Sequence, residues 1–307
     1  MRILQKVGFC KSFCKNTGLF FACRWKKLVF AVASFIHRFL ILYISIFFFP
    51  SGYLNAVELE NGEVLLYDIV YLGMNVGHAT LSVNRGLTLQ NKTNCMIYKS
   101  TAKSSSIIDY LYPVEDRMVS YFDPVNSRTI ASSKIVHEGN LHREYYADYD
   151  YYHKSVNWWQ KYHKGKNKIS QPGDVTFRAK SGKTVAIPES LLDILSLLYY
   201  LRRSPTEPIE NTFFIMPVYD DLQITNIEFH ILKKEIKTFE VNKRETEYSV
   251  FKIQVYLATS GFFQNNGKLF IYLSADSERI PLKIEASIGG LGSVKVILRE
   301  IRKQDSP

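Results

Sequence analysis

The side chains best suited to hold a ligand are concentrated in one short segment, where eight aromatic residues fall within 18 positions. They are Tyr145, Tyr146, Tyr149, Tyr151, Tyr152, Trp158, Trp159 and Tyr162. Such rings can stack on sugars or line an apolar cavity, with their hydroxyl and indole groups orienting a ligand. The more ordinary interpretation is aromatic pairing across a hairpin. Our candidate ligand-binding residues are Tyr146, Tyr149, Tyr151, Trp158 and Trp159.

A pair of histidines invites comparison with a metal site. His137 and His142 lie close to Glu138 and Glu144 in the sequence. Strand residues five apart point to opposite faces, so a single strand could not use both histidines as ligands. A turn at residues 139–140 would instead fold them together. We expect no metal site and no cofactor.

Two charged segments have equally simple interpretations. Residues 161–168 form a basic stretch that could meet phosphate or anionic lipid groups, although a solvated loop tip is simpler. Asp109, Glu115, Asp116 and Arg117 are expected to form a surface salt bridge near a turn. The chain has no Gly-x-Ser-x-Gly elbow, phosphate loop or dinucleotide fingerprint. We therefore assign no catalytic residue and expect a protein that is not an enzyme.

The N-terminal segment indicates where the chain is sent. Residues 1–56 contain eight basic residues and no acidic one, and they include the apolar run 39–49. This pattern is typical of a signal peptide cleaved after Ala56, or of a retained N-terminal membrane anchor. Both interpretations place residues 57–307 in the periplasm, either free or tethered to the inner membrane.

Charge and cysteine content narrow the function of the remaining chain. The formal charge is +10, but outside the leader 31 basic residues face 29 acidic ones, which leaves only +2. A nucleic-acid partner therefore has no support. Only Cys95 lies outside the leader, so no internal disulfide can form. Its apolar surroundings predict a buried, unreactive thiol.

Alternating apolar and polar residues dominate residues 57–307, which we interpret as a single domain. The pattern predicts many short antiparallel strands, among them 142–149 and 151–159, which must form a curved half-barrel-like sheet or a barrel. One apolar helix is expected at 188–203, with Pro188 in its first turn and Ser204-Pro205 at its end. The expected fold is an all-β sheet packed around this buried helix.

The same region resembles an uncharacterised family of exported bacterial proteins, domain of unknown function 3108. The resemblance spans roughly residues 60–302. Its motifs are residues 63–67, Gly73, Gly77, 112–114 with Asp116, 137–139, 192–196, 199–202, Asp276, 279–281 and 289–292. The resemblance implies a periplasmic β-rich protein and supplies no activity. The layout is also similar to the half-barrel of periplasmic lipoprotein carriers, although shared architecture is weak evidence for function.

These observations lead to two main functional hypotheses. The first is a non-enzymatic protein that binds an apolar or amphipathic envelope ligand on the concave face of the sheet. That ligand would be a lipid, a lipoprotein or a glycan. The second is a periplasmic scaffold with a filled core, which docks an envelope protein through an edge strand or the aromatic hairpin. Membrane contact is expected only through the N-terminal segment. A hydrolase with an unrecognised site is a third hypothesis.

Overall fold

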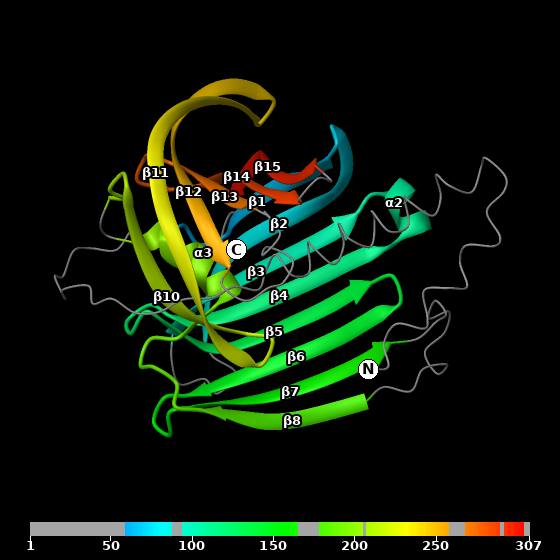
Figure 1. Ribbon diagram of the computed structural model, residues 1–307, viewed down its shortest axis with the longest axis vertical. Helices are drawn as coiled ribbons and strands as arrows, with labels where there is room; N and C mark the ends of the chain where they lie inside the picture. Colours follow the sequence, from blue (N-terminus) through cyan, green and yellow to red (C-terminus); the bar gives the residue numbers. More distant parts are fainter. Residues whose placement is uncertain are drawn as a thin grey trace, which may run out of the picture.

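The computed structural model describes residues 59–87, 94–164, 178–204, 207–257, 268–288 and 292–303. Every strand in these ranges belongs to one 15-stranded sheet, which is open and strongly curved (Figure 1). The all-β prediction is therefore confirmed. The predicted leader at 1–56 and the basic positions 165–168 lie outside the described residues. Within the described ranges, no helix has the length and apolar character to cross a membrane.

The sheet consists of two runs of strands, which are joined where β1, the first strand, pairs with β15, the last. The first run contains β1 (Glu63–Tyr71), β2 (Met74–Leu87), β3 (Asn94–Ser104), β4 (Val114–Asp123), β5 (Arg128–Glu138), β6 (Leu141–Asp150), β7 (Ser155–Lys164) and β8 (Arg178–Val185). The second contains β9 (Leu192–Asp193), β10 (Thr212–Asp220), β11 (Gln223–Val241), β12 (Arg244–Leu257), β13 (Lys268–Ser274), β14 (Pro281–Ile288) and β15 (Gly292–Lys303). Spatial order runs from β8 to β1, then from β15 to β9. Neighbouring strands are antiparallel, except that β9 runs parallel to β10.

Two helices accompany the sheet in the described part of the chain. The short α2 (Ser106–Leu111) joins β3 to β4 and is not predicted by the sequence pattern, whereas α3 (Ile194–Arg203) follows β9. The predicted start of α3 at Pro188 is wrong. The Asp193 side chain caps the helix by accepting from the backbone N–H groups of Leu195 and Ser196, at 2.8 and 2.9 Å. These two bonds satisfy donors that a helix leaves unpaired at its first turn, so the helix begins after Asp193.

Two strand predictions also need correction. The predicted strand at 151–159 begins too early, because residues 151–154 form the turn and β7 starts at Ser155. Strand β10 is missed altogether, because its sequence lacks a period-2 pattern and contains Pro217. Proline is tolerated there since β9 pairs with β10 only at Val218 and Tyr219, which leaves Pro217 on an open edge.

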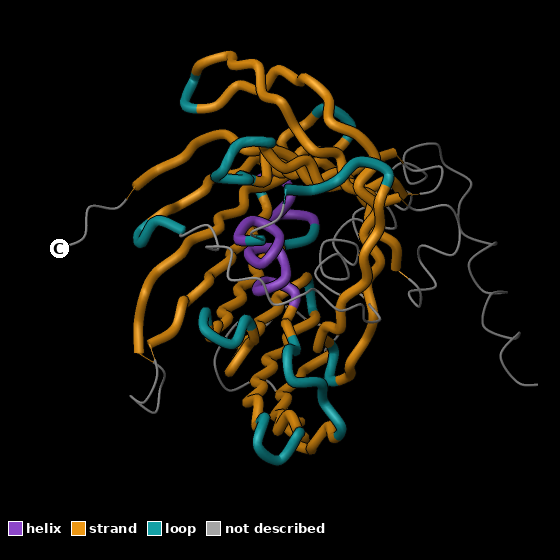
Figure 2. Tube along the Cα trace, turned by 90° about the vertical axis from the view of Figure 1, so that its left-hand side faces the viewer, coloured by secondary structure: helices purple, strands orange, loops and turns teal. Residues whose placement is uncertain are grey.

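The main core fills the space between α3 and the sheet. Helix α3 lies at the centre of the curved strands (Figure 2), with Leu195, Leu197 and Tyr199 almost completely buried. The inward side chains of β1–β4 and β11–β15 form one continuous apolar cluster with it. We call these strands and α3 the body. Because α3 occupies the concave side of the body, the expected ligand site on that face is replaced by a packed core.

Strands β5–β8 extend the sheet beyond the body, and we call them the wing. A second, smaller apolar cluster packs the wing against β10, and it includes Tyr149 and Tyr219. The edge strand β8 reaches the β10–β11 turn through Thr184, whose hydroxyl lies 3.2 Å from the Tyr219 hydroxyl and donates to the Leu222 carbonyl at 3.3 Å. The two ends of the sheet therefore approach each other through side chains, without pairing of their backbones.

Candidate ligand-binding groove

The aromatic hairpin consists of β6 and β7, and its register determines which rings share a face. Tyr146 pairs directly with Trp159, whereas Ala147 pairs with Trp158. Since successive strand residues point to opposite faces, the two tryptophans lie on opposite sides of the sheet. The five candidate residues are thereby separated into two groups.

Three of the candidates face the interior of the protein. Tyr149 is only 6% exposed and belongs to the second core cluster, against which Tyr151 and Trp158 pack. The Tyr151 hydroxyl donates to the backbone carbonyls of Thr129 and Leu191, at 2.6 and 3.1 Å. These contacts tie the wing to the segment that leads into α3. The three rings therefore help to pack the wing, and Trp158 also lines the groove on the wing.

Trp158 also explains a glycine on the edge strand. It pairs across the sheet with Gly182 of β8. A Cβ atom at Gly182 would lie 2.4 Å from the Trp158 ring, which is closer than carbon atoms can approach. The ring therefore lies directly over the β8 backbone and covers the part of this edge strand where Gly182 has no side chain.

The other two candidates lie on the outer face of the wing. The Tyr146 and Trp159 rings are 5.4 Å apart between centroids and tilted by 51°, the arrangement expected of a cross-strand aromatic pair. They line a groove with a volume of about 400 Å³. Tyr121 of β4 lines the same groove. We call this groove the wing groove.

Small and polar residues complete the wing groove. Ala131 and Ser133 of β5 lie between Tyr121 on one side and the β6–β7 hairpin on the other. Asp148 and Asn157 form the cross-strand pair next to Tyr146 and Trp159. Desolvation and the nearby negative charge of Asp150 both raise the pKa of Asp148. The groove thus combines aromatic walls, a floor of small side chains and a polar end.

Sequence reasoning missed Tyr121, Ala131, Ser133, Asp148 and Asn157. Correct placement of the β6–β7 turn would have revealed the last two, because residues equally distant from a hairpin turn pair with each other and share a face. The predicted strand start at 151 shifts that register. The residues of β4 and β5 carry no comparable signal, since their place beside the hairpin depends on two further turns.

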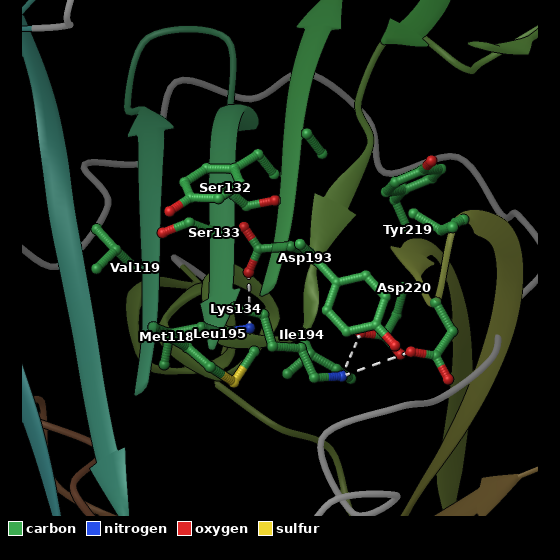
Figure 3. A pocket seen from close by; sticks show the side chains of 15 residues that line it. Met118, Val119, Ser132, Ser133, Lys134, Asp193, Ile194, Leu195, Tyr219 and Asp220 are labelled. Carbon is green, nitrogen blue, oxygen red and sulfur yellow. Dashed lines mark hydrogen bonds and ion pairs between the residues drawn. The ribbon is translucent and has the colours of Figure 1, made fainter. Parts of the chain in front are cut away.

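A second cavity lies on the inner face, where the wing meets the body (Figure 3). Its volume is about 40 Å³, and Lys134, Asp193, Tyr219 and Asp220 contribute to its lining. The Lys134 ammonium lies 3.1 Å from Asp220 and 3.8 Å from Asp221. We call these three residues the junction cluster.

The charges of the junction cluster are unevenly balanced, with two carboxylates facing one ammonium. Burial lowers the pKa of Lys134, but the two carboxylates outweigh this effect and leave its pKa raised. Burial and the negative charge of Asp221 raise the pKa of Asp220 to about 7, against the attraction of Lys134. One buried oxygen of Asp220, Oδ2, has no hydrogen-bond partner among the described residues. Burial thus favours the protonated form of Asp220, while Lys134 favours the charged form.

A buried polar network connects α3 to the sheet close to this cavity. The Asp193 carboxylate accepts from the hydroxyls of Ser120, Thr129 and Ser196, and the Asp193 backbone N–H donates to Thr129 Oγ1 at 3.0 Å. Burial raises the pKa of Asp193. These contacts hold the start of the helix against β4 and β5.

His137 and His142 are brought together by a turn at residues 139–140, as the sequence suggested. Residues 139–140 form the β5–β6 turn, and His137 pairs with His142 across it with ring centroids 4.6 Å apart. The two rings therefore share a face. Among the described residues, no group of three or more His, Cys, Asp or Glu side chains is placed to hold a metal ion.

The acidic segment divides between the two faces of β4. Glu115 forms the expected surface ion pair with Arg117. Asp116 is instead 3% exposed, and burial raises its pKa to about 7 although its carboxylate accepts from the His137 backbone N–H at 3.1 Å. Cys95 is buried as expected, and burial raises its pKa.

Three comparisons relate the chain to known proteins. No curated protein matches this chain. It is similar to a β-barrel-like protein of domain of unknown function 1849 from Brucella abortus, with 9% identity and a TM-score of 0.48 over 79% of this chain and 98% of that one. It is also similar to a candidate exported protein with a YmcC-like fold from Bacteroides fragilis, with 7% identity and a TM-score of 0.33 over 81% of this chain and 100% of that one. The model of the family described as "Protein of unknown function (DUF3108)" matches residues 66–299, so the chain belongs to the DUF3108 family.

Proposed function

We propose that this protein is an exported, non-catalytic binding protein that holds an amphipathic envelope ligand in the wing groove. The proposal keeps the ligand class expected from the sequence and moves its site from the concave face to the outer face of the wing. The observation that carries it is the Tyr146–Trp159 pair, which stands in a groove of about 400 Å³. This volume lies within the ordinary range of ligand pockets.

The exposure of the groove residues supports the proposal. Tyr146 is 44% exposed, although large aromatic side chains usually bury most of their surface when they serve a core. The opposite face of the same hairpin already supplies the packing that holds the wing to β10. The outer pair is therefore free to contact a ligand. The basic leader and its apolar run support delivery across a membrane.

Native mass spectrometry of protein purified from the envelope fraction tests this proposal. We expect a stoichiometric ligand on the wild-type protein and its loss from Trp159→Ala. Tyr256→Ala is the matched control, because Tyr256 is also 44% exposed but lies on β12 of the body. Wild-type protein without any ligand, or a ligand retained equally by Trp159→Ala, would overturn the proposal.

Docking of an envelope protein is the second candidate, and one observation favours it. Strand β8 is a sheet edge, and all of its residues except Thr184 are exposed. Such an edge can accept an added strand, although Arg178, Lys180 and Lys183 place charges that discourage pairing. Proximity cross-linking from a photoreactive residue at position 181 would test this function. Recovery of one envelope protein supports it, and recovery of lipid alone opposes it.

A further inference from the structure

The wing groove presents two chemically different surfaces side by side. Tyr146 and Asp148 are two residues apart on β6, so their side chains share a face at a separation of about 7 Å. Their partners on β7 are Trp159 and Asn157, respectively. An aromatic row is thus followed directly by a row that pairs a carboxylate with an amide.

The width of the groove suits a flat ligand. Tyr121 and Asp148 both flank Ala131, in one register row across three strands. Neighbouring strands are about 4.8 Å apart, so the two sides of the groove are separated by about 10 Å. A small side chain at Ala131 leaves this space open. A ring in van der Waals contact with one side, at about 3.5–4 Å, leaves room for its substituents toward the other side.

We infer that the wing groove takes a neutral saccharide, an inference that rests on the proposed binding function. A sugar ring has C–H faces that stack on aromatic side chains and an edge of hydroxyl groups. Asp148 can accept hydrogen bonds from adjacent hydroxyls, and the Asn157 amide can both donate and accept. The aromatic row and the polar row therefore match the two surfaces of one sugar unit.

The alternative ligand, an acyl chain, fits the groove less well. Hydrocarbon packed over Asp148 and Asn157 would remove their hydration without replacing its hydrogen bonds. The charge at the polar end argues for a neutral sugar. Lys183 of β8 is the register partner of Asn157 and lies two strands from Asp148 in the same row, so this end of the groove carries charges of both signs.

Titration of the envelope-purified protein with cellobiose, chitobiose and maltose tests this inference, and palmitate is the comparison probe. Tryptophan fluorescence and saturation-transfer NMR report binding. We expect at least one disaccharide to bind, with about tenfold weaker affinity in Asp148→Asn and a larger loss in Trp159→Ala, where tenfold corresponds to about 1.4 kcal/mol. Tyr256→Ala should bind like the wild type, and thermal unfolding confirms that each variant is folded.

The outcomes separate the inference from the function on which it rests. Palmitate binding that Trp159→Ala removes, without binding of any disaccharide, overturns the saccharide assignment and leaves the binding function intact. Binding of no probe, together with a ligand-free native mass spectrum, overturns both. A disaccharide that binds all variants equally places its site outside the wing groove and also overturns the inference.

Discussion

The body and the wing are both built from strands with alternating side chains, but they differ in which faces of the sheet are buried. In the body, α3 covers the inward face, and its apolar side chains merge with those of β1–β4 and β11–β15. In the wing, packing against β10 requires only a small cluster, while the outer face keeps an exposed aromatic pair. A sheet face that meets a helix becomes core, whereas a face without such cover remains available for a ligand.

The buried ion pairs of the body and of its junction with the wing also differ. In the body, the Arg202 guanidinium binds the Glu63 carboxylate with two hydrogen bonds of 2.6 and 2.9 Å, and Arg202 is fully buried. In the junction cluster, Lys134 faces two carboxylates, and Asp220 has a raised pKa. The charges of Arg202 and Glu63 cancel each other. The junction cluster has one positive and two negative side chains, so one of its carboxylates can take up a proton.

The largest expected effect is the loss of the body's ion pair. Arg202→Met leaves the Glu63 carboxylate buried without its partner, which we expect to destabilise the fold by about 3–5 kcal/mol. Urea unfolding measures the change. The double variant Arg202→Met/Glu63→Leu should recover most of the loss, because it removes both charges. Equal destabilisation of the single and double variants would show that packing, and not charge pairing, dominates at this position.

The pH dependence of stability is the next largest effect. The pKa of Asp116 is raised from 3.8 to about 7, so between these values the folded protein holds a proton that the unfolded chain releases. Stability therefore falls as pH rises from about 4 to 7, by at most about 4 kcal/mol at 1.36 kcal/mol per unit. Asp220, whose pKa is also raised to about 7, adds a slope of the same sign. We therefore expect Asp116→Asn to reduce the wild-type slope in urea unfolding by about half.

The adjacent carboxylate provides the control for that measurement. Glu115 lies on the opposite, exposed face, and its hydrogen bond from Arg117 is the main reason that its pKa is lowered. Glu115→Gln should leave the slope between pH 5 and 7 unchanged. The same slope in wild type and Asp116→Asn would contradict the assignment of this effect to Asp116.

Removal of the junction lysine should cost less than removal of Arg202. In Lys134→Met, Asp220 can bind a proton and become neutral, so we expect a loss of about 1–3 kcal/mol, the range for a buried group left unsatisfied. The loss should be greater at pH 8 than at pH 5, because Asp220 stays charged at the higher pH. A loss that does not depend on pH would show that Asp220 does not adjust its charge.

The smallest expected change in the free energy of unfolding distinguishes Trp158 from Trp159. Trp158→Ala removes a ring that packs over Gly182 and against the second core, and we expect a loss of about 1–3 kcal/mol, below that of a fully buried tryptophan. Trp159→Ala changes the outer face, and its effect on unfolding should stay within about 1 kcal/mol. Thermal unfolding measures both. Reversed magnitudes would mean that the outer pair supports the fold.

The sequence by itself determined the fold class, most strands and the composition of the hairpin. Period-2 alternation depends only on neighbouring residues, so it reveals strands wherever one face is buried. The end of α3 was equally local, because residues 204–205 cannot continue a helix. The eight clustered aromatic residues also indicated the hairpin that supplies most of the residues lining the candidate groove.

Only the tertiary structure decided which faces are covered. Alternation shows that Trp158 and Trp159 belong to opposite faces, but the side that meets β10 depends on contacts between distant segments. The pairing of β1 with β15 and the ion pair between Glu63 and Arg202 join residues far apart in the chain. The start of α3 depended on Asp193, whose buried carboxylate is satisfied by hydroxyls from β4 and β5. Such contacts form only when the sheet curves around the helix, so no local pattern encodes them.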